Sequence, residues 1–105
     1  MQVNIQAVNF NAELKLLNFI ESRLDKLELF YDRIVRTEVH LKVENTSEKE
    51  NKIVEIKLHI PKDMFVVKKQ CKSFEEAIDS ACSSLERKLV KKKKKPRFQT
   101  SLKFL

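Results

Sequence analysis

Apolar and polar residues alternate in several stretches of the chain, the pattern of strands with one buried face. The strands predicted in this way cover residues 2–8, 35–44, 53–60 and 64–71. The first places Val3, Ile5 and Ala7 on one side. Residues 45–52 are all polar and predict the loop of an antiparallel hairpin. The core-facing residues are predicted to be Val35, Thr37, Val39, Leu41 and Val43, then Val54, Ile56, Leu58 and Ile60.

Two further segments carry apolar residues at the three-to-four spacing of a helix. The first covers roughly residues 12–31, with Asn11 as its cap. Its apolar stripe is Leu14, Leu17, Ile20, Leu24, Leu27 and Tyr31. The second opens with a capping box, in which Ser73 and Glu76 satisfy each other's free backbone donors, and ends by Pro96. Its apolar face is Phe74, Ala77, Ile78, Ala81, Cys82, Leu85 and Leu89.

The order of these elements is β-α-β-β-β-α, with a turn at Pro61 between the last two strands. Amphipathic helices need an apolar surface to cover, so we expect both on one face of a four-stranded sheet, an α+β two-layer sandwich. A chain of 105 residues suits one domain, which we place at residues 1–95, followed by a tail at 96–105 that is flexible until bound. The sequence shows neither a signal peptide nor a membrane span, which predicts a cytoplasmic protein with no membrane partner.

The net charge of +7 is concentrated at one end of the chain. Residues 1–85 hold 13 basic and 14 acidic residues, whereas residues 86–105 hold nine basic residues against Glu86. Helix-dipole complementation accounts for one or two cations at a helix end, but not for the five consecutive lysines Lys91–Lys95. Five adjacent lysines repel one another unless nearby anions neutralise them. The phosphates of a nucleic acid would do so, and the run therefore favours nucleic-acid contact. A solvated tail or contact with an anionic membrane surface is the alternative.

Catalysis has little support in the residue types. Gly is absent, which excludes the usual phosphate-binding loops. His40 and His59 lie on outward faces of neighbouring strands and could be cross-strand neighbours, but no further ligand has suitable spacing for a metal. Cys71 and Cys82 are interpreted as packed small hydrophobes, with a reactive thiol as the alternative. We therefore predict no enzyme, no metal, no cofactor and no small-molecule substrate.

The outward face of the sheet is predicted to be neutral and solvated. Lys42, Lys57 and Lys68 could extend the basic region, but acidic residues interleave with them. These acidic residues are Glu38, Glu44 and Glu55. No aromatic pair stands on an outward strand position to stack bases, so recognition of RNA shape and phosphates by the helices is favoured.

Over roughly residues 1–95 the sequence resembles the ribosome hibernation promoting factor and ribosome-associated inhibitor family. The resemblance rests on the order and spacing of several short motifs. These are Met1–Ile5, Arg23–Glu28, Tyr31–Ile34, Ala77–Asp79 and Leu85–Leu89, the last followed by lysines.

The resemblance implies a fold like the double-stranded RNA-binding domain and binding to rRNA in the channel of the small ribosomal subunit. The protein, expected to be a monomer when free, would block the tRNA and mRNA sites and inhibit translation in stationary phase or stress. Residues matching the family's basic contacts are Arg23, Lys26, Arg87 and Lys91, and Lys88, Lys92, Lys94 and Lys95 adjoin them.

The sequence departs from the family pattern in three places. Ser84 stands where the family commonly has Lys, which would shift RNA contacts toward the lysine run. Ser73–Glu76 replaces the usual Asp-Met-Tyr approach to the second helix. The chain lacks the long C-terminal extension that pairs ribosomes, so it resembles the short form. Two other functions stay open: a protein-interaction module that adds residues 98–105 as a strand to a partner's sheet, and a general RNA-binding protein.

Overall fold

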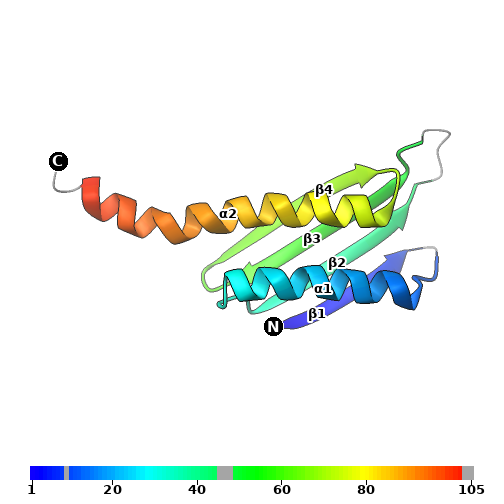
Figure 1. Ribbon diagram of the computed structural model, residues 1–105, viewed down its shortest axis with the longest axis horizontal. Helices are drawn as coiled ribbons and strands as arrows, with labels where there is room; N and C mark the ends of the chain where they lie inside the picture. The colour runs from blue at the N-terminus through cyan, green and yellow to red at the C-terminus, as the bar shows by residue number, and fades with distance from the viewer. Residues whose placement is uncertain (9, 45–48, 103–105) are drawn as a thin grey trace.

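The computed structural model describes residues 1–8, 10–44 and 49–102, and for residues 93–102 the backbone alone. Strands and helices follow one another in the predicted order β-α-β-β-β-α (Figure 1). They are β1 (Gln2–Val8), α1 (Leu14–Phe30), β2 (Arg36–Val43), β3 (Lys52–Ile60), β4 (Asp63–Cys71) and α2 (Phe74–Leu102). Of the predicted loop at 45–52, residues 45–48 lie outside the described residues.

The strands form one mixed sheet in the spatial order β1-β2-β3-β4. β1 is parallel to β2, and α1 makes the crossover that a parallel pair requires. The predicted hairpin is confirmed, because β2 and β3 are antiparallel with Val39 opposite Ile56 and Leu41 opposite Val54. Val35, predicted to face the core, instead precedes β2 and is 56% exposed.

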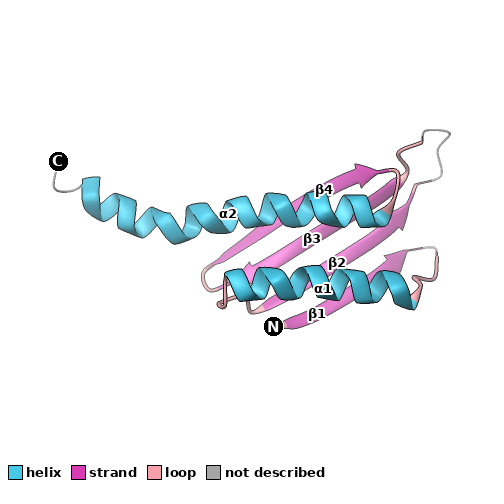
Figure 2. Ribbon diagram, in the orientation of Figure 1, coloured by secondary structure: helices cyan, strands magenta, loops and turns pink. Residues whose placement is uncertain are grey.

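Both helices cover the same face of the sheet, which confirms the predicted α+β two-layer architecture (Figure 2). The largest fully buried side chains come from both layers, and each contributes about 1.5–3 kcal/mol by leaving water. They include Ile20, Leu24, Leu41, Ile56, Leu58, Ile78, Leu85 and Leu89. This shared core holds α1 and α2 side by side, so side chains on their outer surfaces have fixed relative positions.

α1 begins later and buries a different stripe than predicted. Its buried residues are Leu16, Ile20, Leu24 and Leu27. Leu14 is 71% exposed and Leu17 is only partly buried, so the prediction was wrong at these two positions. The N-cap is Glu13, whose side chain makes no capping bond, and Asn11 lies outside the helix. Packing against the sheet therefore fixes the rotation of α1.

The start of α2 agrees with prediction and its end does not. The backbone N–H of Glu76 donates to Ser73 Oγ at 3.2 Å, one of the two bonds of the predicted capping box. α2 then continues to Leu102 rather than ending by Pro96. Proline lacks an N–H and disturbs a helix by kinking as well as by breaking it. In Figure 1 the orange part of α2, beyond the sheet, bends accordingly. The boundary between residues 1–95 and a tail at 96–105 stays a prediction.

The predicted turn after β3 consists of Pro61 and Lys62, closed by the pair Ile60–Asp63. Lys62 has a φ of 66°, in the left-handed region that favours glycine. A proline followed by a residue with positive φ fits a type II turn. Because the chain contains no Gly, Lys62 carries the strain of this turn, about 1–2 kcal/mol.

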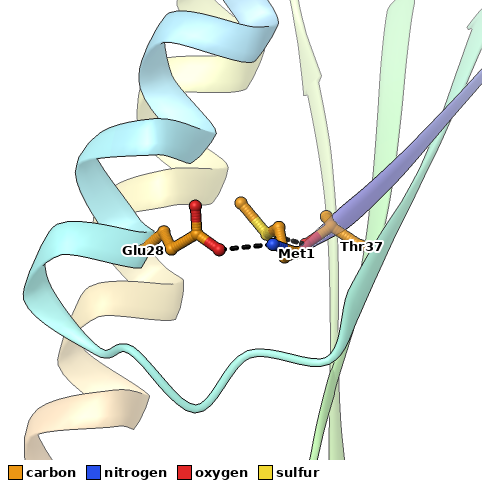
Figure 3. Close-up of polar contacts among 3 residues, drawn as sticks. All are labelled: Met1, Glu28 and Thr37. Carbon is orange, nitrogen blue, oxygen red and sulfur yellow. Dashed lines mark hydrogen bonds and ion pairs between the residues drawn. The ribbon is translucent and has the colours of Figure 1, made fainter.

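The first residue of the chain ties β1 to both neighbouring elements (Figure 3). The ammonium group of Met1 lies 2.5 Å from Oε2 of Glu28 in the last turn of α1. The buried hydroxyl of Thr37 on β2 donates to Sδ of Met1 at 3.0 Å. The first contact ties the start of β1 to the helix layer, and the second ties it to the neighbouring strand β2.

Candidate nucleic-acid interface

On α1, the two predicted contact residues lie beside α2. Arg23 Nε is 2.8 Å from Oδ1 of Asp79 on α2, and its guanidinium lies over the ring of Phe19, 5.1 Å from the centroid. Lys26 is exposed. Both line a cleft of about 310 Å³ between the helices, together with Asp79 and Glu86 from α2. Each cation in this cleft therefore has an acidic side chain in the same lining.

On α2, Arg87, Lys88 and Lys91 are exposed, and Lys92 is half-buried. Arg87 donates to Oγ of Ser84 at 3.3 Å, which keeps its guanidinium along the helix surface. Positions 87 and 91 are one turn apart and share a face. Among the described residues, no ion pair engages Lys26, Arg87 or Lys91. These three side chains are thus available to an external anion.

Two lysines of α2 contact β4. Lys88 Nζ lies 5.9 Å from the centroid of the Phe65 ring, a cation–π contact. Lys92 Nζ is 3.5 Å from Oδ2 of Asp63, the first residue of the strand. Lys92 comes three residues after the buried Leu89, so the side chains of Leu89 and Lys92 lie on the same side of α2, the side that faces the sheet. Lys88 and Lys92 therefore already have partners within the protein.

The predicted contact residues divide into two groups rather than forming one patch. Arg23 and Lys26 line the cleft between the helices, whereas Arg87, Lys88 and Lys91 line a shallow hollow along α2 with Ser83 and Ser84. Ser83 and Glu86 line both. The side chains of Lys94 and Lys95 lie outside the described residues, although α2 carries their backbone past the sheet (Figure 1).

Sequence reasoning missed the acidic residues of the cleft. Asp79, Cys82 and Glu86 follow one another at three- and four-residue spacing, so they share one side of α2. Cys82 on that side is buried and lines the cleft, which shows that it faces α1. The spacing was a usable signal that Asp79 and Glu86 lie on the same side of α2 as Cys82, although it did not show which residues of α1 they face.

The outward sheet face alternates in charge. His40 is paired with Glu55 and His59 with Arg36, so the two histidines are not the cross-strand neighbours that the sequence allowed. His59 Nε2 is instead 2.7 Å from Oε2 of Glu38. This hydrogen bond lowers the pKa of Glu38 below its ordinary value, and the charges of His59, Arg36 and Lys57 act in the same direction.

The thiols have the properties of packed side chains. Burial raises the pKa of the Cys82 thiol to about 11, and the nearby Asp79 charge adds to the rise. Burial also raises the pKa of Cys71. Among the described residues no group of three or more His, Cys, Asp or Glu side chains is placed to hold a metal ion. No helix in the described part of the chain is long and apolar enough to span a membrane.

The fold and this surface define a class of protein. It is a small α+β domain in which the lysine-rich helix α2 lies beside α1, and an ion pair between Arg23 and Asp79 joins the two helices. The family model for the sigma 54 modulation protein / S30EA ribosomal protein matches residues 3–97. A ribosome hibernation promoting factor from Azotobacter vinelandii is 30% identical over 95 residues, covering 90% of this chain and 85% of the relative. One from Pseudomonas putida is 32% identical, covering 90% and 89%. The chain therefore belongs to this family, as its sequence motifs predicted.

Two solved structures share the fold. A ribosomal subunit interface protein from Coxiella burnetii superposes with a TM-score of 0.78 at 18% identity, covering 89% of this chain and 98% of that one. The N-terminal domain of Protein Y from Thermus thermophilus gives a TM-score of 0.70 at 21% identity, covering 84% and 94%. At these identities the likeness concerns the arrangement of the sheet and helices.

Proposed function

We propose that this protein binds rRNA in the channel of the small ribosomal subunit, occupies the tRNA and mRNA sites, and so inhibits translation during stationary phase or stress. The observation that carries the proposal is the exposed basic face of α2, with Arg87, Lys88 and Lys91 leading into the lysine run. Family membership supports the ribosome as partner. The proposed action is occupancy by a cytoplasmic monomer, without catalysis or a cofactor.

Binding through phosphates has a physical consequence that distinguishes it from binding through apolar contacts. Each lysine or arginine that neutralises a phosphate releases condensed counterions, so affinity falls with salt by a log–log slope of about 0.7 to 0.9 per contact. Lys26, Arg87 and Lys91 are exposed and form no ion pair with any described residue, so each can make such a contact without giving up a partner there. The remaining proposed contacts are Arg23, Lys88, Lys92, Lys94 and Lys95.

The test is co-sedimentation with isolated small ribosomal subunits at low and moderate salt. A variant with Lys91–Lys95 changed to Gln should lose salt-sensitive binding. The matched control removes the same charge elsewhere, by changing five exposed or half-exposed lysines outside the helices to Gln. These are Lys42, Lys49, Lys57, Lys68 and Lys72. If both variants lose binding equally, net charge alone acts and the α2 interface is wrong. If the wild-type protein does not sediment with the subunits, the proposed function fails.

The protein-interaction alternative required residues 98–105 to add a strand to a partner. The described part of this segment, up to Leu102, is helical, which does not favour that mode. Removal of residues 97–105 separates the two functions, because ribosome binding should largely survive it and strand addition should not.

A further inference from the structure

Arg23 differs from Lys26, Arg87 and Lys91 because a carboxylate of the same chain already engages it. Its Nε and the Oδ1 of Asp79 are 2.8 Å apart, across the boundary between α1 and α2. The two side chains are 34% and 49% exposed, so an approaching phosphate can reach the pair from solvent. Cζ of the same guanidinium lies 5.1 Å from the centroid of the Phe19 ring, so Arg23 makes a cation–π contact as well as the contact of its Nε with Asp79.

The geometry points to Asp79 as an intramolecular competitor for Arg23, whose carboxylate engages the guanidinium in the free protein and yields it when an rRNA phosphate binds. Carboxylates and phosphates are recognised by the same guanidinium donors, so the two anions compete for them. A phosphate near Arg23 also meets the negative charge of Asp79. The inference rests on the proposed function and adds that the interface is held below its full affinity.

The exchange is feasible because the internal pair is half-exposed. Exposed ion pairs are weak in water, and breaking one lowers an affinity by about two- to five-fold. The cation–π contact with Phe19 does not involve Asp79, so it can persist when a phosphate replaces the carboxylate. Arg23 therefore needs no large movement to change partners. Glu86 lines the same cleft as Lys26, so the acidic character of this cleft extends beyond one pair.

A double-mutant cycle on sedimentation with small ribosomal subunits tests the competition. Asp79→Asn should raise the affinity of the otherwise wild-type protein by about two- to five-fold. The same substitution should give no such gain in an Arg23→Gln background, because the cation for which Asp79 competes is then absent. Asp25→Asn is the control, since it removes an equal charge from an exposed position elsewhere on α1.

The outcomes separate competition from its alternatives. An equal gain from Asp79→Asn in both backgrounds, or from Asp25→Asn, would reduce the effect to net charge and overturn the inference. A loss of affinity would overturn it too, since Asp79 would then position Arg23 for RNA. Asp79→Ser should give the same gain in affinity as Asp79→Asn. The thermal melts of both variants show whether each is folded. Wild-type protein that fails to sediment would instead overturn the proposed function, and the inference with it.

Discussion

The availability of Arg87 and Lys91 leads to a quantitative prediction. Both are exposed, lie one helical turn apart, and have no ion-pair partner among the described residues. Changing both to Gln should remove two phosphate contacts while leaving the core untouched. Such surface substitutions alter the free energy of unfolding by no more than about 0.5 kcal/mol, so the variant should remain folded.

The magnitude follows from the number of contacts. Two contacts lower the log–log salt slope by about 1.4 to 1.8. Over a fourfold increase in salt concentration, wild-type affinity should therefore fall about ten-fold further than that of the variant. The two slopes are obtained from dissociation constants for small ribosomal subunits, measured by the same titration at each of several salt concentrations.

The control for this measurement is the pair Lys42→Gln and Lys57→Gln, which removes the same charge from the outward sheet face. It should leave the slope close to that of the wild type. An Arg87→Gln, Lys91→Gln variant with an unchanged slope would refute the reasoning, because these exposed cations would then make no phosphate contact. Equal slope changes in both variants would refute it as well, since position on the molecule would not matter.

Three other predictions concern particular residues. Lys62→Gly should raise the free energy of unfolding by about 0.5–1 kcal/mol in denaturant titration, because glycine adopts the φ of 66° without strain. Glu38 has a lowered pKa in the folded protein, so its contribution is present above the ordinary value of 4.5 and lost as the pH falls below it. Acid unfolding of Glu38→Gln should therefore depend less on pH in that range. Cys82, with a pKa of about 11, should resist a thiol-alkylating reagent near neutral pH until the protein is unfolded.

The strands could be predicted closely because alternation has a period of two, and a shift by one residue would expose the apolar set. The rotation of α1 could not. Leu16 and Leu17 each continue into Ile20 and Leu24 at helical spacing, so two stripes fit the sequence equally well. Only packing against the sheet chooses Leu16.

The positive charge of the candidate site could be predicted from the sequence, but the contacts between its basic and acidic side chains could not. The basic excess after Glu86 is visible in the sequence, but the acidic partners of Arg23 and Lys92 depend on how α2 meets α1 and the β3–β4 turn. The same limit applies to the histidines. Their alternation gave the correct face, whereas the register that pairs His59 with Arg36 depends on the length and shape of the hairpin.

The position of β1 has a consequence for the order of folding. β2, β3 and β4 pair with their neighbours in sequence, whereas β1 joins the sheet only after the chain has passed through α1. Local pairings close short loops at low entropic cost, and distant ones form later. None of the β1 residues is fully buried, so release of β1 exposes less apolar surface than release of β3 would. We expect the amides of β1 to exchange with solvent faster than those of β3, and the Met1–Glu28 contact to set how often this strand detaches.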